Sequence, residues 1–542
     1  MNDRLEPWRD AIEAQVHELD EAGVLARMHR GDHTLWRPDP DEIANRLGWL
    51  DAPAAARDMR DDLVAFANAI RIDGTERVVV LGMGGSSLAP EVLAHVFGPR
   101  PGAPVLSVLD GTVPGTVIPA IETLDPARTL FIVSSKSGGT IETISLFKAF
   151  YRRTAGVVGP AAAGARFVAV TDPGSDLAAL AKRLGFRRTF LADPNVGGRF
   201  SALTPFGLVP AAIAGIDPAI LLDPIGDGAA AERDGLRLGA TLAVLAAAGR
   251  DKLTFVADDA IAPLGIWLEQ LLAESTGKDG KGLLPIDDEP LAAPESYGPD
   301  RVFVRIRLGR PDAEDPRREA LDALAAAGHP VVDDPVAVRA AVGAAFLRWE
   351  VATAVVAIPL GVQPFDQPDV EAAKTAAREA LAAYERDGAL PEEPDDGAGG
   401  DLGAFLDGVT EGGYVAIQAF LPAGEETEDA LAELRAAIGA RSGRPTTLGW
   451  GPRYLHSTGQ LHKGDAGKGS FVMLTTAHDR DWPIPTEPDD DASTHGFALL
   501  ADAQALGDRR ALRAAGRRVL WLRFDDDAAV AVRELAAGLA GA

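Results

Sequence analysis

The stretch that decides the fold is RVVVLGMGGSSL, residues 77–88, in which a β-branched run leads into a glycine-rich turn and a helix. A continuous apolar strand of this kind is typical of a parallel sheet that helices cover on both faces. Such sheets bind their ligands beyond the carboxyl ends of the strands, where this turn lies. The stretch therefore predicts an α/β fold with a binding site at Gly84, Gly85 and Ser86.

The same alternation of strand and helix continues along the chain and divides it into units. Strands are expected at 105–109, 129–133 and 166–171, then at 252–257, 301–308 and 330–332, and finally at 414–421, 470–475 and 518–524. We predict an N-terminal helical segment (1–55), two α/β domains (56–225 and 226–390), an acidic Pro- and Gly-rich linker (391–403) and a smaller C-terminal α/β domain (404–542).

Composition narrows the class of protein. The chain has 542 residues, 53 basic against 80 acidic, and a net charge of −27, which argues against nucleic acid as a partner. A local pocket can still bind a small anion. The absence of cysteine excludes disulfides, thiolate nucleophiles and zinc ribbons. Because no apolar run approaches a membrane span and MNDRLEPWRD lacks a signal-peptide core, we expect a cytoplasmic protein without a membrane partner.

Two polar loops follow predicted strands and suit an anion. The first has the spacing G-x-G-G-S-S, which fits a dinucleotide site poorly and leaves a structural tight turn as the alternative. The second, SSKSGGTIET (134–143), packs hydroxyls and glycines between a strand and a helix, and an N-cap would explain only one or two of them. It also holds Lys136, although only nine of the 53 basic residues are lysines. We interpret this loop as a phosphate cradle.

Three further segments carry charged side chains in settings that suit catalysis. Arg199 follows two glycines and can stabilise an oxyanion, unless it is a surface arginine. Glu274 continues the apolar face of a helix that starts after Pro263, which predicts a raised pKa and a role in proton abstraction, unless the helix frays there. Lys374 is expected on the buried stripe of a helix over 370–385, with snorkelling to solvent as the alternative.

These five motifs, in this order, resemble the glucose-6-phosphate isomerase family. The resemblance covers roughly residues 75 to 385, and its most specific parts are ESTGK (274–278) and FDQPDVEAAK (365–374). It implies two sugar-isomerase domains of the parallel-sheet sandwich type, a phosphosugar substrate, and neither metal nor other cofactor. The arrangement is closest to the isomerase half of proteins that fuse transaldolase to this enzyme.

The resemblance also implies roles for individual residues. Ser135, Ser137, Thr140 and Thr143 match the phosphate-binding hydroxyls, Arg199 the residue that stabilises the intermediate, and Glu274 the base. Gln367 matches a substrate-binding glutamine and Lys374 a lysine of the ring-opening step.

The ring-opening histidine of the family is not at its usual place, because no histidine lies between Glu274 and His329. The segment GPRYLHSTGQLHKG (451–464) is similar to the family's Gln-His region but comes about 180 residues later. We therefore predict His456 as the ring opener, with His462 as the fallback and a structural pair of histidines as the alternative. If the third unit supplies this histidine within one chain, a monomer suffices; otherwise a homodimer is expected.

The resemblance implies reversible aldose–ketose isomerisation of glucose 6-phosphate and fructose 6-phosphate by metal-free proton transfer through an enediol(ate). Three alternatives stay open. One is a non-catalytic sugar-phosphate-binding regulator, another an isomerase for a related phosphosugar such as mannose 6-phosphate. The third, a nicotinamide-dependent oxidoreductase, is disfavoured by the spacing of the first loop.

Overall fold

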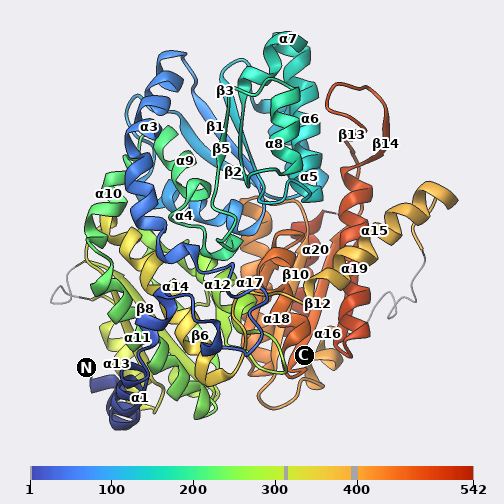
Figure 1. The fold of residues 1–542 in the computed structure, drawn as a ribbon. Coiled ribbons are helices and arrows are strands. Elements are labelled where there is room, and N and C mark those ends of the chain that lie inside the picture. The colour runs from blue at the N-terminus through green and yellow to red at the C-terminus, as the bar shows by residue number, and fades with distance from the viewer. Residues whose placement is uncertain (1–2, 310–314, 392–400, 526, 541–542) are drawn as a thin grey trace.

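The computed structural model describes residues 3–309, 315–391, 401–525 and 527–540. Within these ranges the chain forms three parallel sheets flanked by helices, and one small antiparallel hairpin. In Figure 1 the first sheet lies at the top, the second at the lower left and the third at the lower right. The predicted α/β class is confirmed. Residues 392–400 of the predicted linker lie outside the described residues.

The N-terminal segment is only partly helical. It contains η1 (Asp3–Trp8), α1 (Arg9–Glu21), α2 (Val24–His29), η2 (His33–Leu35) and η3 (Gly48–Leu50), where η marks a 3₁₀-helix. Within this predicted helical segment, residues 41–50 consist mostly of turns, and their backbone pairs with the first unit. Gly48 N donates to Asn195 O at 3.1 Å, and Leu47 forms a bridge with Val196.

The first sheet has the strand order β2-β1-β3-β4-β5, all parallel. Val78 and Val80 pack on α3, α4 and α9, whereas Val79 and Leu81 pack on α5, α6 and α8, so both faces are covered as predicted. The unit comprises α3 (Ala52–Ile72), β1 (Arg77–Gly82), η4 (Gly84–Ser86), α4 (Leu88–Phe97), β2 (Val105–Leu109), α5 (Pro114–Thr123), β3 (Thr129–Ser134), α6 (Ile141–Val158), α7 (Pro160–Ala163), η5 (Gly164–Arg166), β4 (Phe167–Thr171), α8 (Asp176–Arg183), β5 (Arg188–Leu191), η6 (Gly198–Phe200), α9 (Pro205–Ile213), α10 (Pro218–Leu222) and η7 (Asp223–Ile225).

The second sheet has the order β7-β6-β8-β9 and is also parallel. Its elements are α11 (Ala229–Ala247), β6 (Lys252–Ala257), η8 (Asp259–Ile261), α12 (Leu264–Thr276), β7 (Leu284–Ile286), η9 (Pro294–Ser296), β8 (Arg301–Leu308), α13 (Arg318–Ala326), β9 (Val331–Val336), η10 (Arg339–Ala341), α14 (Val342–Leu360) and α15 (Val370–Asp387). The segment Arg339–Leu360 is long and apolar enough to cross a membrane, but 78% of its most apolar window is buried inside the protein, where α14 packs on α11. It is a core helix of this unit.

The third sheet has the order β11-β10-β12-β15. Its elements are α16 (Leu402–Asp407), β10 (Tyr414–Phe420), α17 (Glu425–Ser442), β11 (Thr446–Trp450), η11 (Arg453–His456), α18 (Gly459–Gly464), β12 (Gly469–Thr476), β13 (Pro483–Pro485), β14 (Ser493–Gly496), α19 (Phe497–Ala514), β15 (Arg518–Phe524) and α20 (Ala528–Ala540). One face packs on α17 and α20. The other carries Tyr414 and Phe471, which pack with Leu284 and Ile286 of the second sheet.

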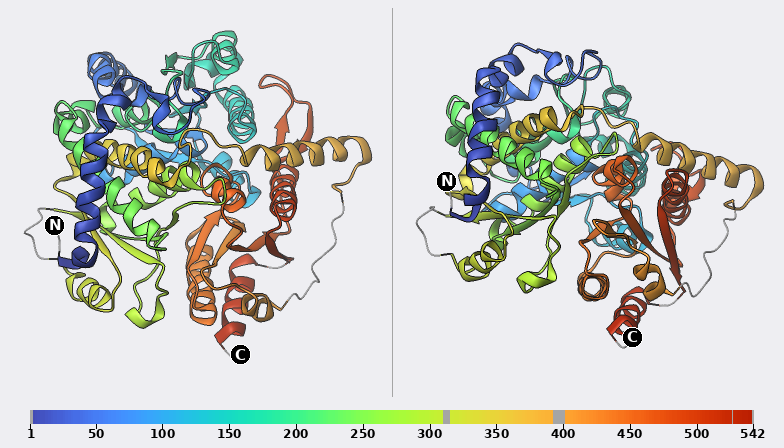
Figure 2. Two further views of the ribbon diagram at one scale, coloured as in Figure 1. Left: turned by 60° about the horizontal axis from the view of Figure 1, so that its bottom comes forward. Right: turned by 90° about the horizontal axis from the view of Figure 1, so that it is seen from below.

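Helix α15 joins the units rather than covering the second sheet. It lies along α19, so closely that a Cβ added at Gly507 would be 2.6 Å from Ala377 N. Its distal end projects outward beyond α19 in both views of Figure 2. The β13–β14 hairpin packs on α6, so the third unit reaches the first unit as well as α15.

Candidate active site

Two glycine motifs meet backbone to backbone at the carboxyl end of β1. A Cβ added at Gly85 would lie 1.9 Å from Gly198 O, which explains why this contact requires glycine. Gly84 has a φ of +54° and leads through Ser86 into α4. The contact places the first loop directly beside Arg199. The turn is therefore tight for a packing reason, which is compatible with either predicted role.

The hydroxyl loop between β3 and α6 is folded on its own side chains. Ser135 Oγ lies 3.2 Å from Thr140 Oγ1 and accepts from Gly138 N at 3.1 Å, while Ser137 Oγ accepts from Gly139 N at 3.2 Å. Ser137 and Thr140 line a cavity. Thr143 is fully buried in the first turn of α6, and its Oγ1 has no hydrogen-bond partner within the described part of the chain.

Lys136 does not face this cavity. Its Nζ lies 2.5 Å from Asp172 Oδ2 and donates to Pro194 O at 3.0 Å. A lysine that is paired in this way holds the end of β4 to the loop. The structure thus gives Lys136 a structural contact, and its predicted contact with a phosphate stays a prediction.

Arg199 and Glu274 form a buried ion pair. Arg199 Nη1 lies 3.1 Å from Glu274 Oε1, with the two side chains only 3% and 14% exposed. The guanidinium is held by Ser275 Oγ at 2.8 Å, Gln367 Oε1 at 2.9 Å and Pro364 O at 2.6 Å. Burial lowers the pKa of Arg199, against the opposing charge of Glu274. This geometry excludes a surface arginine and a frayed helix end.

A second buried cation lies next to this pair. Lys278 Nζ lies 2.6 Å from Asp366 Oδ1, and its side chain is 2% exposed. Burial, together with the nearby charge of Arg199, lowers the pKa of Lys278 to about 8. Each of the two cations is paired with a carboxylate, so they can stabilise an anionic intermediate only over the short distances at which it would contact them.

Gln270 lies on the same helix as Glu274 and had no predicted role. It links the two halves of the site. Its Nε2 donates to Glu274 Oε2 at 3.0 Å and to His456 O at 2.8 Å. Gln270 precedes Glu274 by one helical turn, so the two share a face of α12. The four-residue spacing could have predicted the contact between Gln270 and Glu274 from the sequence. The contact with His456 could not be predicted, because it depends on how the third unit packs.

His456 reaches the first unit from η11. Its Nε2 lies 2.9 Å from Glu142 Oε1, and the two side chains are 17% and 5% exposed. Burial would raise the pKa of Glu142, but the charge and hydrogen bond of His456 outweigh burial and hold this pKa below its usual value. Glu142 belongs to the hydroxyl loop 134–143, but the order of residues in that loop does not predict a partner so distant in the sequence.

His462 lies elsewhere, in the core of the third unit. Its side chain is 2% exposed, its ring packs on Phe471, and its Nδ1 lies 3.3 Å from Gln418 Nε2. Burial and the nearby Lys463 lower the pKa of His462 well below its usual value. This ring does not line the cavity, so the geometry favours His456 over the fallback His462, and the choice between them stays a prediction.

Gln460, in the same segment 451–464, has a structural role. It donates to Gly277 O at 3.0 Å and accepts from Asp369 N at 2.9 Å, so α18 joins the end of α12 to the start of α15.

The side chain of Lys374 is not buried, contrary to the prediction for α15. Its side chain is 42% exposed, and Nζ lies 2.8 Å from Glu371 Oε1. Val370 and Leu381 of the same helix are buried as expected, together with Ala373 and Ala380. Lys374 nevertheless lines the cavity, on the same side as His456.

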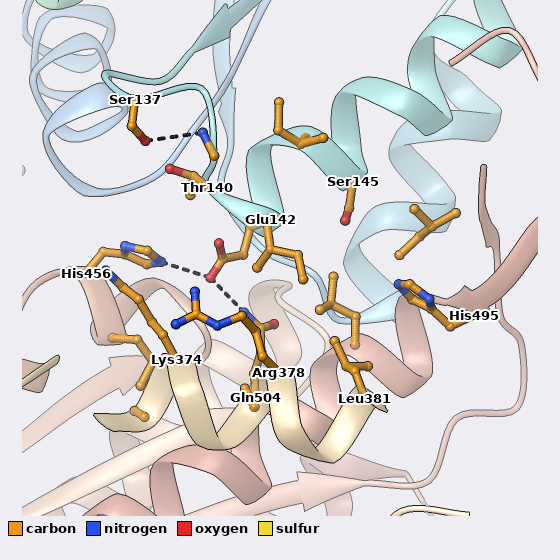
Figure 3. A pocket seen from close by; sticks show the side chains of 18 of the residues that line it. Ser137, Thr140, Glu142, Ser145, Lys374, Arg378, Leu381, His456, His495 and Gln504 are labelled. Atoms are coloured by element: carbon orange, nitrogen blue, oxygen red, sulfur yellow. Dashed lines mark hydrogen bonds and ion pairs between the residues drawn. The ribbon is translucent and has the colours of Figure 1, made fainter. Parts of the chain in front are cut away.

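The cavity has a volume of about 680 Å³ and lies between α6, α15 and the β13–β14 hairpin. Figure 3 shows Ser137 and Thr140 above, Lys374 and Arg378 below, and the contact of His456 with Glu142 between them. Arg199, Glu274 and Gln367 do not line it; Gln270 connects them to His456. The candidate residues thus form two adjoining groups, one open to the cavity and one buried at the C-terminal end of α12.

Comparison with known proteins agrees with this arrangement. The family model described as phosphoglucose isomerase matches residues 66–224. Glucose-6-phosphate isomerase from Rubrobacter xylanophilus is 34% identical over 426 residues, which cover 68% of this chain and 95% of that protein. The chain belongs to the glucose-6-phosphate isomerase family. Several other members align over 57% to 63% of their own length.

Solved structures show the same fold. A hypothetical protein from Thermus thermophilus is 27% identical with a TM-score of 0.58, and the match covers 70% of this chain and 98% of that chain. A glucose-6-phosphate isomerase from Chlamydia trachomatis is 18% identical with a TM-score of 0.56, covering 69% and 86%. These matches confirm the predicted sugar-isomerase fold. The closer resemblance to transaldolase fusion proteins and the exact domain boundaries stay predictions.

Proposed function

We propose that the protein catalyses the reversible isomerisation of glucose 6-phosphate and fructose 6-phosphate. Family membership supports the reaction, and the buried pair of Arg199 and Glu274 is the observation that carries it to this chain. A carboxylate held against a fixed cation can take a proton while the cation stabilises the charge that develops.

Substrate binding begins with the phosphate. Ser137 and Thr140 line the cavity beside the glycines of the same loop, so hydroxyls and backbone N–H groups would hold the phosphate. Ser135 supports both through its contacts with Thr140 and Gly138. Lys136 is occupied by Asp172, and we therefore give the lysine a supporting role.

Ring opening comes next, and we assign it to His456 with Lys374. Both side chains line the cavity next to the hydroxyl loop. The ring opens when the anomeric hydroxyl loses its proton and the ring oxygen gains one. An imidazole and an ammonium can provide this exchange near neutral pH.

Isomerisation of the open sugar is assigned to Glu274. Its carboxylate removes the proton from C2, the C2–H electron pair forms the C1–C2 double bond, and the aldehyde oxygen becomes an enediolate oxygen. Arg199, which Gln367 and Ser275 hold in place, stabilises that charge. The proton of the C2 hydroxyl then passes to the C1 oxygen, C1 takes back the proton held by Glu274, and C2 becomes the carbonyl carbon of the ketose.

The reaction needs no cofactor, since the carbonyl group acidifies the proton and the oxidation at C2 balances the reduction at C1. A metal-free mechanism thus follows from the chemistry that we propose.

Two narrower alternatives differ in measurable ways. Mannose 6-phosphate differs from glucose 6-phosphate only in the configuration at C2, where Glu274 acts. Activity on mannose 6-phosphate therefore depends on whether its C2 proton can point toward the Glu274 carboxylate. A non-catalytic regulator would bind phosphosugars without turning them over. The buried Glu274, whose desolvation a mere binding site would not require, favours catalysis.

We further propose that one chain contains a complete site, because the third unit supplies His456 to Glu142 of the same chain. Specific activity should then stay constant on dilution to nanomolar protein, while light scattering reports the oligomeric state. Activity that falls as a dimer dissociates would show that a partner completes the site. The cytoplasmic location stays a prediction.

The test of the proposed function is a coupled assay on fructose 6-phosphate without added metal, followed by mannose 6-phosphate. We expect turnover of fructose 6-phosphate, with glucose 6-phosphate as product. Binding of fructose 6-phosphate without turnover would favour the regulator.

A further inference from the structure

Glu142 has a second partner from the third unit. Gln504, on α19, donates from Nε2 to Glu142 Oε1 at 2.7 Å, the same oxygen that His456 Nε2 contacts at 2.9 Å. Gln504 is only 4% exposed. Both contacts are drawn in Figure 3, where Gln504 lies below Glu142 and His456 beside it. One carboxylate oxygen is thus shared by a histidine and an amide from separate segments of the third unit.

The carbonyl oxygen of the Gln504 amide has its own partner, Thr112. Thr112 Oγ1 donates to Gln504 Oε1 at 2.8 Å, and Thr112 is fully buried. In this arrangement the carbonyl oxygen of the amide faces the Thr112 hydroxyl and its NH₂ group faces the Glu142 carboxylate, which can only accept when ionised. A carboxylate that faces a fixed N–H donor is held in its ionised, accepting form.

The state of Glu142 in turn decides where His456 carries its proton. Because an ionised carboxylate can only accept, Nε2 must carry the hydrogen in the contact with Glu142. The other ring nitrogen, Nδ1, is then the atom that can exchange a proton with a ligand in the cavity.

We propose that Gln504 is a positioning residue of the site: its N–H group holds the Glu142 carboxylate in place against His456 and lowers the basicity of that carboxylate, so that the neutral ring carries its hydrogen on Nε2 and Nδ1 acts on the sugar. This inference rests on the ring-opening role proposed for His456, although the proton position can be measured without substrate. It also explains why the third unit contributes α19 as well as η11 to the cavity.

The remaining charged groups around the pair are compatible with this role. Glu142 lies within the field of Lys374, and Glu371 within that of His456. The same cavity is also lined by charged or titratable side chains of α6, α15, α18 and β14, namely Lys148, Arg378, Lys463 and His495. Lys463 is itself paired with Asp508 at 2.5 Å. Since Gln504 is neutral, its replacement by leucine leaves all of these charges in place.

The test is an NMR titration of the protein labelled with ¹⁵N and ¹³C at histidine, with His456 assigned by its loss in His456→Gln. In the unchanged protein we expect the neutral ring to carry its hydrogen on Nε2. In Gln504→Leu, the carboxylate loses a donor, becomes a stronger base and stabilises the imidazolium more. The titration midpoint of His456 should therefore move up by about one pH unit. Gln504→Glu should move it further, because a second carboxylate then faces the pair.

Two further variants keep the test decisive. Ser145→Ala, one turn along α6 and in the same cavity, should leave the midpoint unchanged. Thr112→Val frees the amide to rotate and should shift the midpoint in the same direction as Gln504→Leu, by less; it decides the matter if Gln504→Leu does not fold. An unchanged midpoint in folded Gln504→Leu, or in folded Thr112→Val if only that variant folds, would overturn the inference, and so would a neutral ring of the unchanged protein that carries its hydrogen on Nδ1.

Activity separates this inference from the proposed function. If it holds, the acidic limb of kcat on fructose 6-phosphate should move with the midpoint of His456. A protein without isomerase activity that still shows the NMR shifts would refute the proposed function alone. An active protein without the shifts would refute the role of Gln504 alone.

Discussion

His456 Nε2 lies 2.9 Å from Glu142 Oε1, although the two residues are 314 positions apart in the chain. The contact joins the third unit to the hydroxyl loop of the first. It places the candidate ring opener at the cavity, in a segment where the usual family order of motifs does not predict a histidine.

This contact separates the two histidines of the third unit. His456→Ala should lower turnover of fructose 6-phosphate by about 10²- to 10⁴-fold, the usual contribution of an acid–base group. His462→Ala should instead lower the free energy of unfolding by about 2 to 4 kcal/mol, because it empties a buried site beside Phe471. Steady-state kinetics and denaturant unfolding measure the two effects. Equal, mild losses of activity would mean that neither histidine opens the ring.

The fork of Arg199 is expected to matter as much as its charge. Lysine at this position cannot contact Ser275, Gln367 and Pro364 together, so Arg199→Lys should reduce kcat by about 10²-fold or more. Arg57→Lys is the matched control, because Arg57 also donates to backbone carbonyls, of Leu222 and Gly226, away from the site. A full kcat in Arg199→Lys would remove the arginine from the reaction.

The packing of the two glycine motifs predicts a strong effect on stability. In Gly85→Ala the new Cβ would overlap Gly198 O, with backbone on both sides and no side chain to yield. We expect a loss of more than about 3 kcal/mol in the free energy of unfolding. Gly156→Ala, in α6 with nothing within 4 Å of the added Cβ, should stabilise the protein by up to about 1 kcal/mol. A tolerated Gly85→Ala would show that the loops do not pack in this way.

Burial raises the pKa of Glu269, a carboxyl on α12, to about 8, and the charge of Asp287 adds to the effect. A carboxyl group with a raised pKa stabilises the fold fully below its unfolded pKa near 4.5, and this contribution is lost as the pH rises through 8. Glu269→Gln mimics the protonated form at every pH. Relative to the unchanged protein it should therefore gain stability between pH 5 and pH 8, on the order of 2 kcal/mol. Urea unfolding of both proteins at pH 5 and at pH 8 checks this. A difference in the free energy of unfolding that is the same at both pH values would contradict it.

Much of the fold could be predicted because its central strands, such as Val78–Leu81, are buried on both faces and so are continuously apolar. The strands that the sequence did not indicate are short or at an edge, as in Arg188–Leu191 and Leu284–Ile286. Their residues have less apolar surface to bury and therefore show a weaker pattern.

The candidate site divides in the same way. Arg199, Glu274 and Gln367 follow from local motifs, and the structure brings them together. Glu142 and Gln504 depend on contacts between distant units, which no local spacing reveals. Lys374 shares its face of α15 with the buried Val370 and Leu381, but helical periodicity cannot reveal that this face also lines a cavity, which leaves the lysine partly exposed.

The most direct test of the central claim is turnover of fructose 6-phosphate by Glu274→Gln, with binding of the same sugar measured by calorimetry. Glutamine keeps the size of the side chain and can still contact Arg199 and Gln270, but it cannot accept the C2 proton. We expect isomerisation to fall by at least about 10³-fold while the dissociation constant changes only a few-fold. Turnover within a few-fold of the unchanged protein would contradict it.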